Sequence, residues 1–318
     1  MGAAGSLVNK RALAAGACAC LLSVAVTACA PAGPSAQRAA TGRARGSGAA
    51  TAAPGAKEPG SSASASESVS GWKAASSVPS VQPTGAATDA KPYSWNFRRN
   101  KTHTVPEIPE AARTLAAGWN ALWIGPERKN VYLTFDEGYE AGYTTQILDI
   151  LEREGVKATF FVTATYVRDS PKLVRRMVAE GHTVGSHSAT HPSMPKLTSD
   201  PAAFASQFTK TADRFRSATG KPIARLFRPP MGDYSEASLK MARDLGYTTA
   251  FWSFAHADYD EKKQPPVAQT LALILQGSHP GAIYLLHGMS SSDTKALDAA
   301  IRGLRAQGYG FGVLEPTR

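Results

Sequence analysis

Short apolar runs alternate with amphipathic segments from residue 131 to residue 314, and this alternation constrains the fold more than any other feature of the chain. The apolar runs have the length of buried strands, and the amphipathic segments have the spacing of helices. Strands that alternate with helices form a parallel sheet that is covered by helices. About 228 residues, 91–318, are available for this region, which is enough for one well-buried α/β domain.

The alternation predicts seven strands and six helices. The strands are expected at residues 132–135, 158–162, 182–186, 226–228, 248–253, 281–286 and 311–314. The helices are expected at residues 143–154, 171–180, 202–219, 235–245, 266–276 and 295–307. Active sites of such folds form at the carboxyl ends of the strands, so polar residues just after a strand are the first candidates for function.

The N-terminal part of the chain has the pattern of an export signal. Two basic residues precede an apolar stretch at residues 12–28, in the order found in signal peptides. The sequence VTAC, which ends at Cys29, resembles the lipobox of bacterial lipoproteins. We therefore predict a lipoprotein signal peptide over residues 1–28, with Cys29 lipidated and holding the protein at a membrane. Ordinary cleavage near Cys29, followed by secretion, is the alternative.

Residues 29–90 are mostly Ala, Gly, Ser and Pro, with Trp72 as the one aromatic residue. Such a segment cannot bury enough apolar surface to offset the entropy of ordering, so we predict a disordered tether. It would join the membrane anchor to a domain that faces the cell wall or periplasm. The formal net charge is +10, but no basic run or aromatic–basic stripe accompanies it, so nucleic-acid binding is not expected. No feature points to a fixed protein partner, and we expect a monomer.

The cysteines limit the metal chemistry that is open to the folded region. All three of them, Cys18, Cys20 and Cys29, precede residue 30. Residues 91–318 therefore offer no thiolate ligand and no disulfide. Any metal bound there must be held by His, Asp or Glu.

Titratable or cationic residues follow five of the expected strands. Because the carboxyl ends of parallel strands meet at one rim, we expect these side chains to share a site. They are Asp136, Glu137, His187, His191, Arg228, Asp258 and His287.

Two of these groups suggest a metal site. Asp136 and Glu137 are adjacent at the end of the first strand, where both could face one site, and like charges so close are costly unless a cation or a proton lies between them. His187 and His191 are four residues apart, so a helical turn would place both imidazoles on one side. Two histidines and one carboxylate can hold a divalent cation and leave positions open for water and substrate. Taken singly, each pattern is also consistent with solvated or structural side chains.

The sequence RPPMG after the fourth strand predicts a rigid bend. Pro229 and Pro230 fix the backbone, and Gly232 allows a sharp turn. This bend would present the Met231 N–H as an oxyanion donor. Arg228 can pair with a carboxylate and hold it ionised, although a structural bend with a surface arginine is the simpler alternative.

His287 ends a buried strand and can act as a general acid if a carboxylate raises its pKa. Asp258 is the candidate neighbour, with a contact expected through Arg228. Substrate contacts are expected from Tyr139, Pro230, Trp252 and Leu285.

Four motifs together resemble those of carbohydrate esterase family 4, the NodB-homology polysaccharide deacetylases. The matches are TFDEGY to the family's TFDDG, HSATH to H-S/T-x-x-H, RPPMG to R-P-P-x-G, and LLH to L-x-H. The family fold is a distorted (β/α) barrel with fewer than eight strands, so the resemblance implies about seven parallel strands here. It also implies hydrolysis of N- or O-acetyl groups with a divalent metal, usually zinc.

The resemblance assigns roles to the residues near the metal. Asp136 would be the general base, and His187 and His191 would be metal ligands. Glu137 occupies the position of the family's metal-binding aspartate. Glutamate is one methylene longer, so this position is the one departure from the common pattern.

The resemblance also assigns the groups that act on the acetyl group. Arg228 would orient Asp136, and the Met231 N–H would help to hold the oxyanion. His287 would protonate the leaving amine.

A narrower likeness, to the PdaA-type delta-lactam-biosynthetic de-N-acetylases, extends from YSWNF at residues 93–97 through EGYEAGYT to FWS at residues 251–253. It implies release of acetate from peptidoglycan amino sugars, with N-acetylmuramic acid as the first choice. One alternative is deacetylation of another polysaccharide that contains N-acetylglucosamine or is chitin-like. A second alternative is a non-catalytic, glycan-binding lipoprotein, which the departure at Glu137 favours and the retained Asp136 and His287 oppose.

Overall fold

The computed structural model describes residues 88–317. The expected signal peptide, Cys29 and nearly all of the tether lie outside these residues. Within the described part, no helix is long and apolar enough to cross a bilayer. Packing begins slightly before the expected boundary, because the Ala237 N–H donates to the carbonyl of Asp89.

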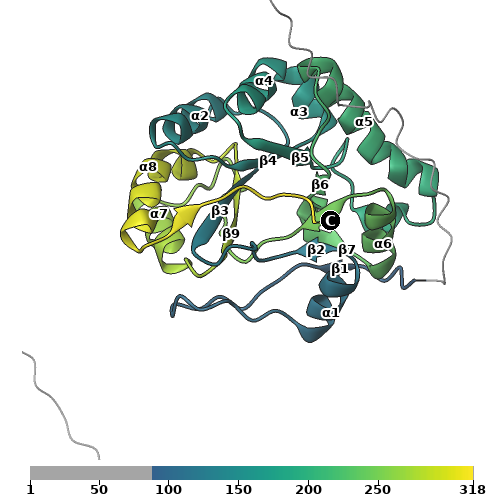
Figure 1. Cartoon of the computed structure of the whole chain (residues 1–318), viewed down its shortest axis with the longest axis horizontal. Coiled ribbons are helices and arrows are strands. Elements are labelled where there is room, and N and C mark those ends of the chain that lie inside the picture. Colours follow the sequence, from purple (N-terminus) through teal and green to yellow (C-terminus); the bar gives the residue numbers. More distant parts are fainter. Residues whose placement is uncertain (1–87, 318) are drawn as a thin grey trace, which may run out of the picture. The chain divides into compact units, whose positions relative to one another are not determined.

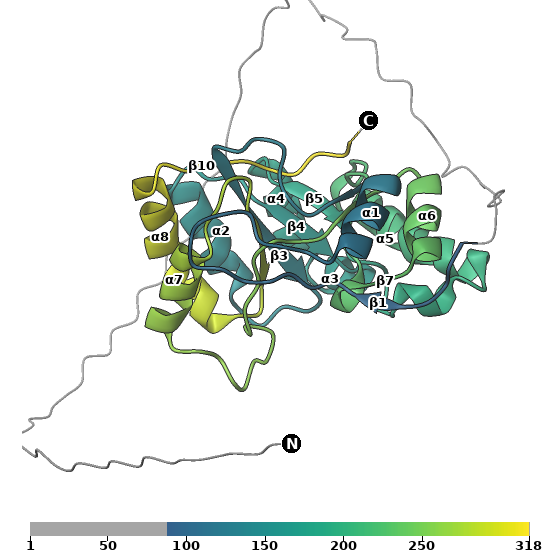
Figure 2. The same cartoon turned by 90° about the horizontal axis from the view of Figure 1, so that it is seen from below.

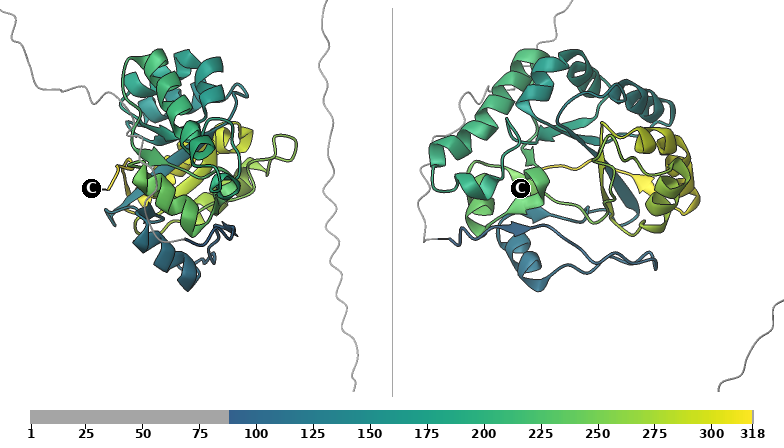
Figure 3. Two further views of the ribbon diagram at one scale, coloured as in Figure 1. Left: turned by 90° about the vertical axis from the view of Figure 1, so that its right-hand side faces the viewer. Right: turned by 180° about the vertical axis from the view of Figure 1, so that it is seen from behind.

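Parallel strands form one curled sheet with helices outside it (Figures 1 and 3). Its strands are β2 (Ala121–Leu122), β3 (Asn130–Glu137), β4 (Thr159–Val162), β5 (Thr183–Ser186), β6 (Leu226–Phe227), β8 (Thr248–Ala250), β9 (Ile283–His287) and β10 (Gly310–Phe311). Their order is β10-β3-β4-β5-β6-β8-β2, and β9 also pairs with β3. Beyond β8, Phe254 forms a parallel bridge with Tyr284 on β9, which closes the ring of strands. The predicted distorted (β/α) barrel is therefore confirmed.

Helices cover the outside of the barrel, and α7 and α8 lie side by side at one end of it (Figure 2). They are α1 (Glu110–Gly118), α2 (Thr144–Arg153), α3 (Ala164–Asp169), α4 (Pro171–Ala179), α5 (Pro201–Thr219), α6 (Glu236–Asp244), α7 (Val267–Gln276) and α8 (Ser291–Ala306), with 3-10 turns η1 (Met194–Leu197) and η2 (Pro230–Gly232). Helix α3 was not predicted because six residues are too few to show a helical period. Thr163 begins it, and its side chain accepts the Tyr166 N–H.

The N-terminal segment of the described region is attached to the bend that follows β6. Strand β1 (Tyr93–Ser94) pairs antiparallel with β7 (Asp233–Tyr234). The backbone N–H of Trp95 donates to the carbonyl of Gly232 at 2.9 Å, and its indole N–H donates to the carbonyl of Trp252 at 2.8 Å. This attachment explains why the segment before the barrel is ordered.

Strand β3 extends to Glu137, two residues beyond its predicted end. Side chains alternate between the two faces of a strand. Leu133 and Phe135 pack among the core residues between sheet and helices, and Tyr132 packs in the barrel interior. By this alternation Asp136 points into the barrel and Glu137 points toward the helices. The expectation that both acids face one site is therefore wrong.

The register of the parallel strands brings the functional residues to one level. Asp136 on β3 is the register partner of His287 on β9. Ser186 on β5 is the partner of Phe227 on β6, so the residues that follow them, His187 and Arg228, reach the same rim. Candidate groups from four strands thus surround one opening.

Candidate active site

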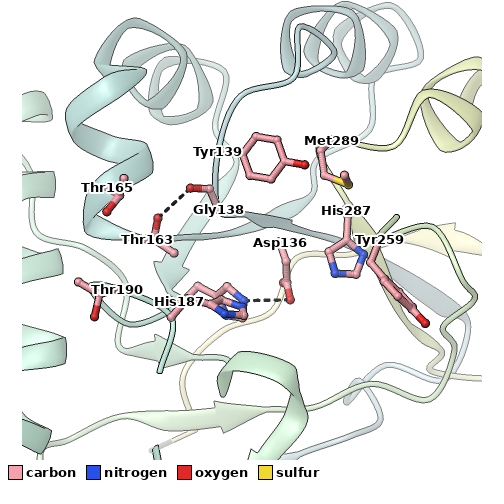
Figure 4. A pocket seen from close by; sticks show the side chains of 11 residues that line it. Asp136, Gly138, Tyr139, Thr163, Thr165, His187, Thr190, Tyr259, His287 and Met289 are labelled. Atoms are coloured by element: carbon pink, nitrogen blue, oxygen red, sulfur yellow. Dashed lines mark hydrogen bonds and ion pairs between the residues drawn. The ribbon is translucent and has the colours of Figure 1, made fainter. Parts of the chain in front are cut away.

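A pocket of about 460 Å³ opens at this rim (Figure 4). It is lined by Asp136, Gly138, Tyr139, Thr163, Thr165, His187, Thr190, His191, Tyr259, His287 and Met289. A second pocket of about 440 Å³ shares several of these residues and adds an apolar wall. The wall is formed by Pro229, Met231, Trp252, Ala255 and Leu285.

Three of the four expected substrate contacts lie at these pockets. Tyr139 lines the first pocket and is half exposed, whereas Trp252 and Leu285 line the second. Pro230 is buried and lines neither of them, whereas the preceding residue, Pro229, lines the second pocket. Met231 is 55 % exposed and has a φ of 60°, a conformation rare for residues other than glycine, so the predicted bend is sharp.

Asp136 is held by a fully buried arginine. Arg228 Nη1 donates to Asp136 Oδ1 at 2.8 Å, and the guanidinium carbon lies 4.2 Å from the centre of the Phe161 ring. Burial alone would raise the pKa of Asp136, but the charges of Arg228 and two histidines outweigh it and lower that pKa. Asp136 is therefore ionised at neutral pH and able to accept a proton.

His187 and His191 lie together, but the loop that carries them is not the predicted helical turn. Ser188 and His191 have positive φ values of 65° and 62°, and the two imidazole centres are 4.9 Å apart. His187 Nδ1 lies 2.9 Å from the carbonyl oxygen of Arg228. Because a carbonyl only accepts, Nδ1 carries the proton and Nε2, which is 3.5 Å from Asp136 Oδ2, carries the lone pair.

The two histidines suit a divalent cation. Burial lowers the pKa of His187 to about 4 and also lowers the pKa of His191, so both rings are neutral at pH 7. The neutral imidazole is the form that binds metal. The hydrogen bond from His187 Nδ1 to a backbone carbonyl is also the usual way in which a ligating histidine is oriented.

Glu137 does not join the histidines. It is fully buried, its two carboxylate oxygens lie 3.4 and 3.5 Å from Thr144 Oγ1 on α2, and it does not line either pocket. A Cβ added at Gly288 would come within 2.2 Å of both oxygens, so the space around the carboxyl group is filled. Burial, aided by the charges of Glu140 and Asp136, raises the pKa of Glu137 well above its ordinary value. In this orientation Glu137 does not fit as a third metal ligand.

His287 contacts Asp258 directly and not through Arg228, which corrects the expected route. Asp258 Oδ1 lies 2.9 Å from His287 Nδ1, and Asp258 Oδ2 accepts the His287 backbone N–H at 2.8 Å. Burial opposes the charge on the imidazole, but the Asp258 carboxylate outweighs it and raises the pKa of His287. His287 is thereby suited to carry a proton for transfer.

Sequence reasoning missed two residues next to this pair, one of which, His256, lines the second pocket. His256 Nε2 is 2.8 Å from Asp293 Oδ1, and both side chains are 1 % exposed. Asp293 precedes the helix predicted at residues 295–307, and acidic residues are common at the start of helices, so no pattern marks it. His256 lies in a loop, two residues before Asp258, and no sequence pattern distinguishes a functional histidine at such a position.

The chain is similar in sequence to known proteins of one family. Residues 124–250 match the polysaccharide deacetylase family. The chain is 39 % identical over 226 residues to the peptidoglycan-N-acetylmuramic acid deacetylase PdaA of Bacillus subtilis, covering 71 % of this chain and 85 % of that protein. The chain belongs to the polysaccharide deacetylases.

Solved structures of family members agree with this assignment. The structure of Bacillus subtilis PdaA, a family 4 carbohydrate esterase, superposes with a TM-score of 0.68 at 38 % identity, covering 71 % of this chain and 96 % of that one. A family 4 pseudoenzyme from Bacillus anthracis superposes with a TM-score of 0.55 at 33 % identity, covering 61 % and 67 %. The family therefore contains a pseudoenzyme as well as proteins described as deacetylases.

Proposed function

We propose that the protein removes the N-acetyl group from peptidoglycan amino sugars, foremost N-acetylmuramic acid, and releases acetate. The observation that carries the proposal is the placement of Asp136 and His287 as register partners at one pocket. The first is an ionised carboxylate and the second an imidazole with a raised pKa, so one can take a proton and the other can give one. The sugar is proposed from the likeness to PdaA.

Each residue of the pocket has a task in this hydrolysis. Asp136 takes a proton from the attacking water, whose oxygen forms a bond to the acetyl carbon. Arg228 keeps Asp136 ionised and fixed, and the bend at Met231 offers a backbone N–H to the oxyanion. As the carbon–nitrogen bond breaks, His287 gives its proton to the departing amine. The products are acetate and a free amino sugar.

A divalent metal, with zinc as the first candidate, would be held by His187 and His191. When bound, such an ion polarises the acetyl carbonyl and acidifies water. His187→Ala is expected to lose the metal, as measured by elemental analysis of the purified protein.

Acetate release from purified peptidoglycan, with and without added zinc, tests the activity. Mass spectrometry of the digested glycan locates the lost acetyl group on muramic acid or glucosamine. Loss from glucosamine alone would replace the proposed substrate. No release with any divalent ion would reject catalysis in favour of glycan binding.

We also propose that the protein is exported and works as a monomer at the cell wall, held at a membrane by lipidated Cys29. The lipobox-like sequence before Cys29 and the composition of residues 29–90 support this proposal. Membrane fractionation of cells that express Cys29→Ala tests it, because an unchanged membrane fraction would reject the anchor.

A further inference from the structure

Next to the Asp258–His287 pair lies a second buried pair, His256 and Asp293, that the proposed mechanism does not use; His256 also lines the second pocket. His256 Nε2 is 2.8 Å from Asp293 Oδ1. The carboxyl group of Asp293 in turn contacts that of Asp258. Three buried titratable side chains and the partly buried His287 thus form a continuous series of contacts, and both of its ends, His287 and His256, line a pocket of the candidate site.

The contacts favour a proton between the two carboxyl groups. Both oxygens of Asp258 accept hydrogen bonds from His287. Asp293 Oδ2 is buried and has no donor for a hydrogen bond. Two ionised carboxylates in contact repel each other strongly in a buried setting, and a shared proton removes this repulsion.

The surroundings indicate which group carries that proton. Burial and the neighbouring Asp258 raise the pKa of Asp293 well above its ordinary value. Burial would also raise the pKa of Asp258, but His287 outweighs it and the pKa of Asp258 is lowered. Burial lowers the pKa of His256, so that ring is neutral and donates through Nε2.

We propose that Asp293 is a neutral carboxylic acid that donates its proton to Asp258, and that His256 and Asp293 are positioning residues for the Asp258–His287 pair. The hydrogen bond from Asp293 draws negative charge away from the Asp258 oxygens, so Asp258 holds the proton of His287 less tightly. The imidazolium is then less stabilised, and His287 releases the proton of its other ring nitrogen, Nε2, to the leaving amine. In this last step the inference rests on the proposed function.

A metal ion is the other way to relieve the repulsion. The ligand atoms of His256, Asp258 and Asp293 all lie within 4.8 Å of one another. However, Asp293 Oδ1 already faces His256 Nε2, and Asp258 Oδ1 already faces His287 Nδ1, so a cation held through these atoms would displace existing hydrogen bonds. The geometry favours the proton.

The charged and titratable groups that face this series come from every element packed against it. They are Arg99 before α1, Asp136 on β3, His191 after β5, His256, Asp258 and Tyr259 between β8 and α7, His287 on β9, and Asp293 on α8. Because several of them act on His287, a test must change Asp293 alone and follow His287 directly.

The test is an NMR pH titration of the histidine-labelled full chain, with the His287 signal assigned from His287→Gln. Asp293→Asn keeps a neutral donor toward Asp258, so the pKa of His287 should stay within about 0.3 units of the wild-type value. Asp293→Ala removes the donor, and the pKa of His287 should rise by about 0.5 to 1 unit. Asp298→Asn, a partly exposed acid on the same helix, is the matched control and should cause no shift.

Three results would overturn the proposal. A fall of about one unit or more in Asp293→Asn would mean that Asp293 is ionised in the native protein. An unchanged pKa of His287 in Asp293→Ala would make Asp293 merely structural. One more equivalent of zinc in the wild type than in Asp293→Asn would make the cluster a metal site. The titration needs no substrate, so it stands even if acetate release fails.

Discussion

Asp136 and Glu137 are neighbours in sequence and both are buried, yet they lie in opposite electrostatic environments. On the barrel side of β3, Asp136 lies 2.8 Å from the Arg228 guanidinium, and its pKa is lowered. On the helix side, Glu137 has a threonine hydroxyl beyond 3.3 Å and its pKa is raised. The difference shows that the face of the strand, and not proximity along the chain, decides what a carboxyl group can do.

The largest expected effect is that of Asp136→Asn. Loss of the general base should lower acetate release by about 10²–10⁴-fold. It should also reduce the free energy of unfolding by about 3–5 kcal/mol, because Arg228 is left buried without its counter-charge. Enzyme assays and denaturant unfolding measure the two effects. If this variant kept full activity, the base would have to be another group.

A second experiment probes how tightly the helix side of β3 is filled. Gly288→Ala should destabilise the protein by about 1–3 kcal/mol, because its Cβ would overlap the carboxyl group of Glu137. In a Glu137→Ala background the same change should cost less. A double-mutant cycle by denaturant unfolding measures this coupling, and a coupling of zero would mean that the two groups do not meet.

Glu137 and Asp136 should contribute to the free energy of unfolding with opposite dependences on pH. The unfolded chain ionises Glu137 above its ordinary pKa of 4.5, while the folded protein keeps it protonated to a higher pH. Keeping Glu137 protonated in the folded state therefore lowers the free energy of unfolding by an amount that grows as the pH rises from 4.5 through the raised pKa of the folded state. Glu137→Gln removes that cost, so its stability relative to the wild type should increase from pH 4 to pH 8.

Asp136→Asn is the counterpart in that measurement. The lowered pKa of Asp136 contributes stability above the unfolded value of 3.8, and this contribution is lost as the pH falls through the lower folded value. The deficit of this variant should therefore shrink below pH 4. Both comparisons are made on chelator-treated protein, and the same pH trend in both variants would contradict the assignment of the two faces.

The smallest expected effect is that of Glu137→Gln on catalysis. Because Glu137 faces α2 and is not placed as a ligand, acetate release should stay within about threefold of the wild type. The metal content should also be unchanged, as measured by elemental analysis. Loss of metal in this variant would restore Glu137 to the ligand position that its motif implies.

The sequence predicted the rim of the barrel well, because strand ends and parallel topology bring Asp136, His187, Arg228 and His287 to one level whatever the details of the loops. The sequence-based prediction failed where a small change in the backbone alters the direction in which a side chain points. An extension of β3 by two residues turned Glu137 to the other face. Similarly, two positive φ values, and not a helical turn, bring the two histidines together.

Contacts between distant segments could not be predicted either. Asp293 shows its role only when the start of α8 is placed against the loop that carries Asp258, which is 35 positions earlier. Helix α1 and strand β2 have too few residues on a buried face to give a clear period.

The attachment of Trp95 has a consequence for the order in which parts of the nascent chain can fold. Its indole hydrogen bond joins residues 157 positions apart, so the segment around Trp95 cannot complete its attachment until Trp252 has been synthesised. Contacts of such long sequence separation slow folding and form late. Trp252 lines the apolar wall of the pocket, so this wall is completed only after most of the barrel has emerged. A nascent chain that stalls before residue 252 would expose aromatic side chains to chaperones and proteases.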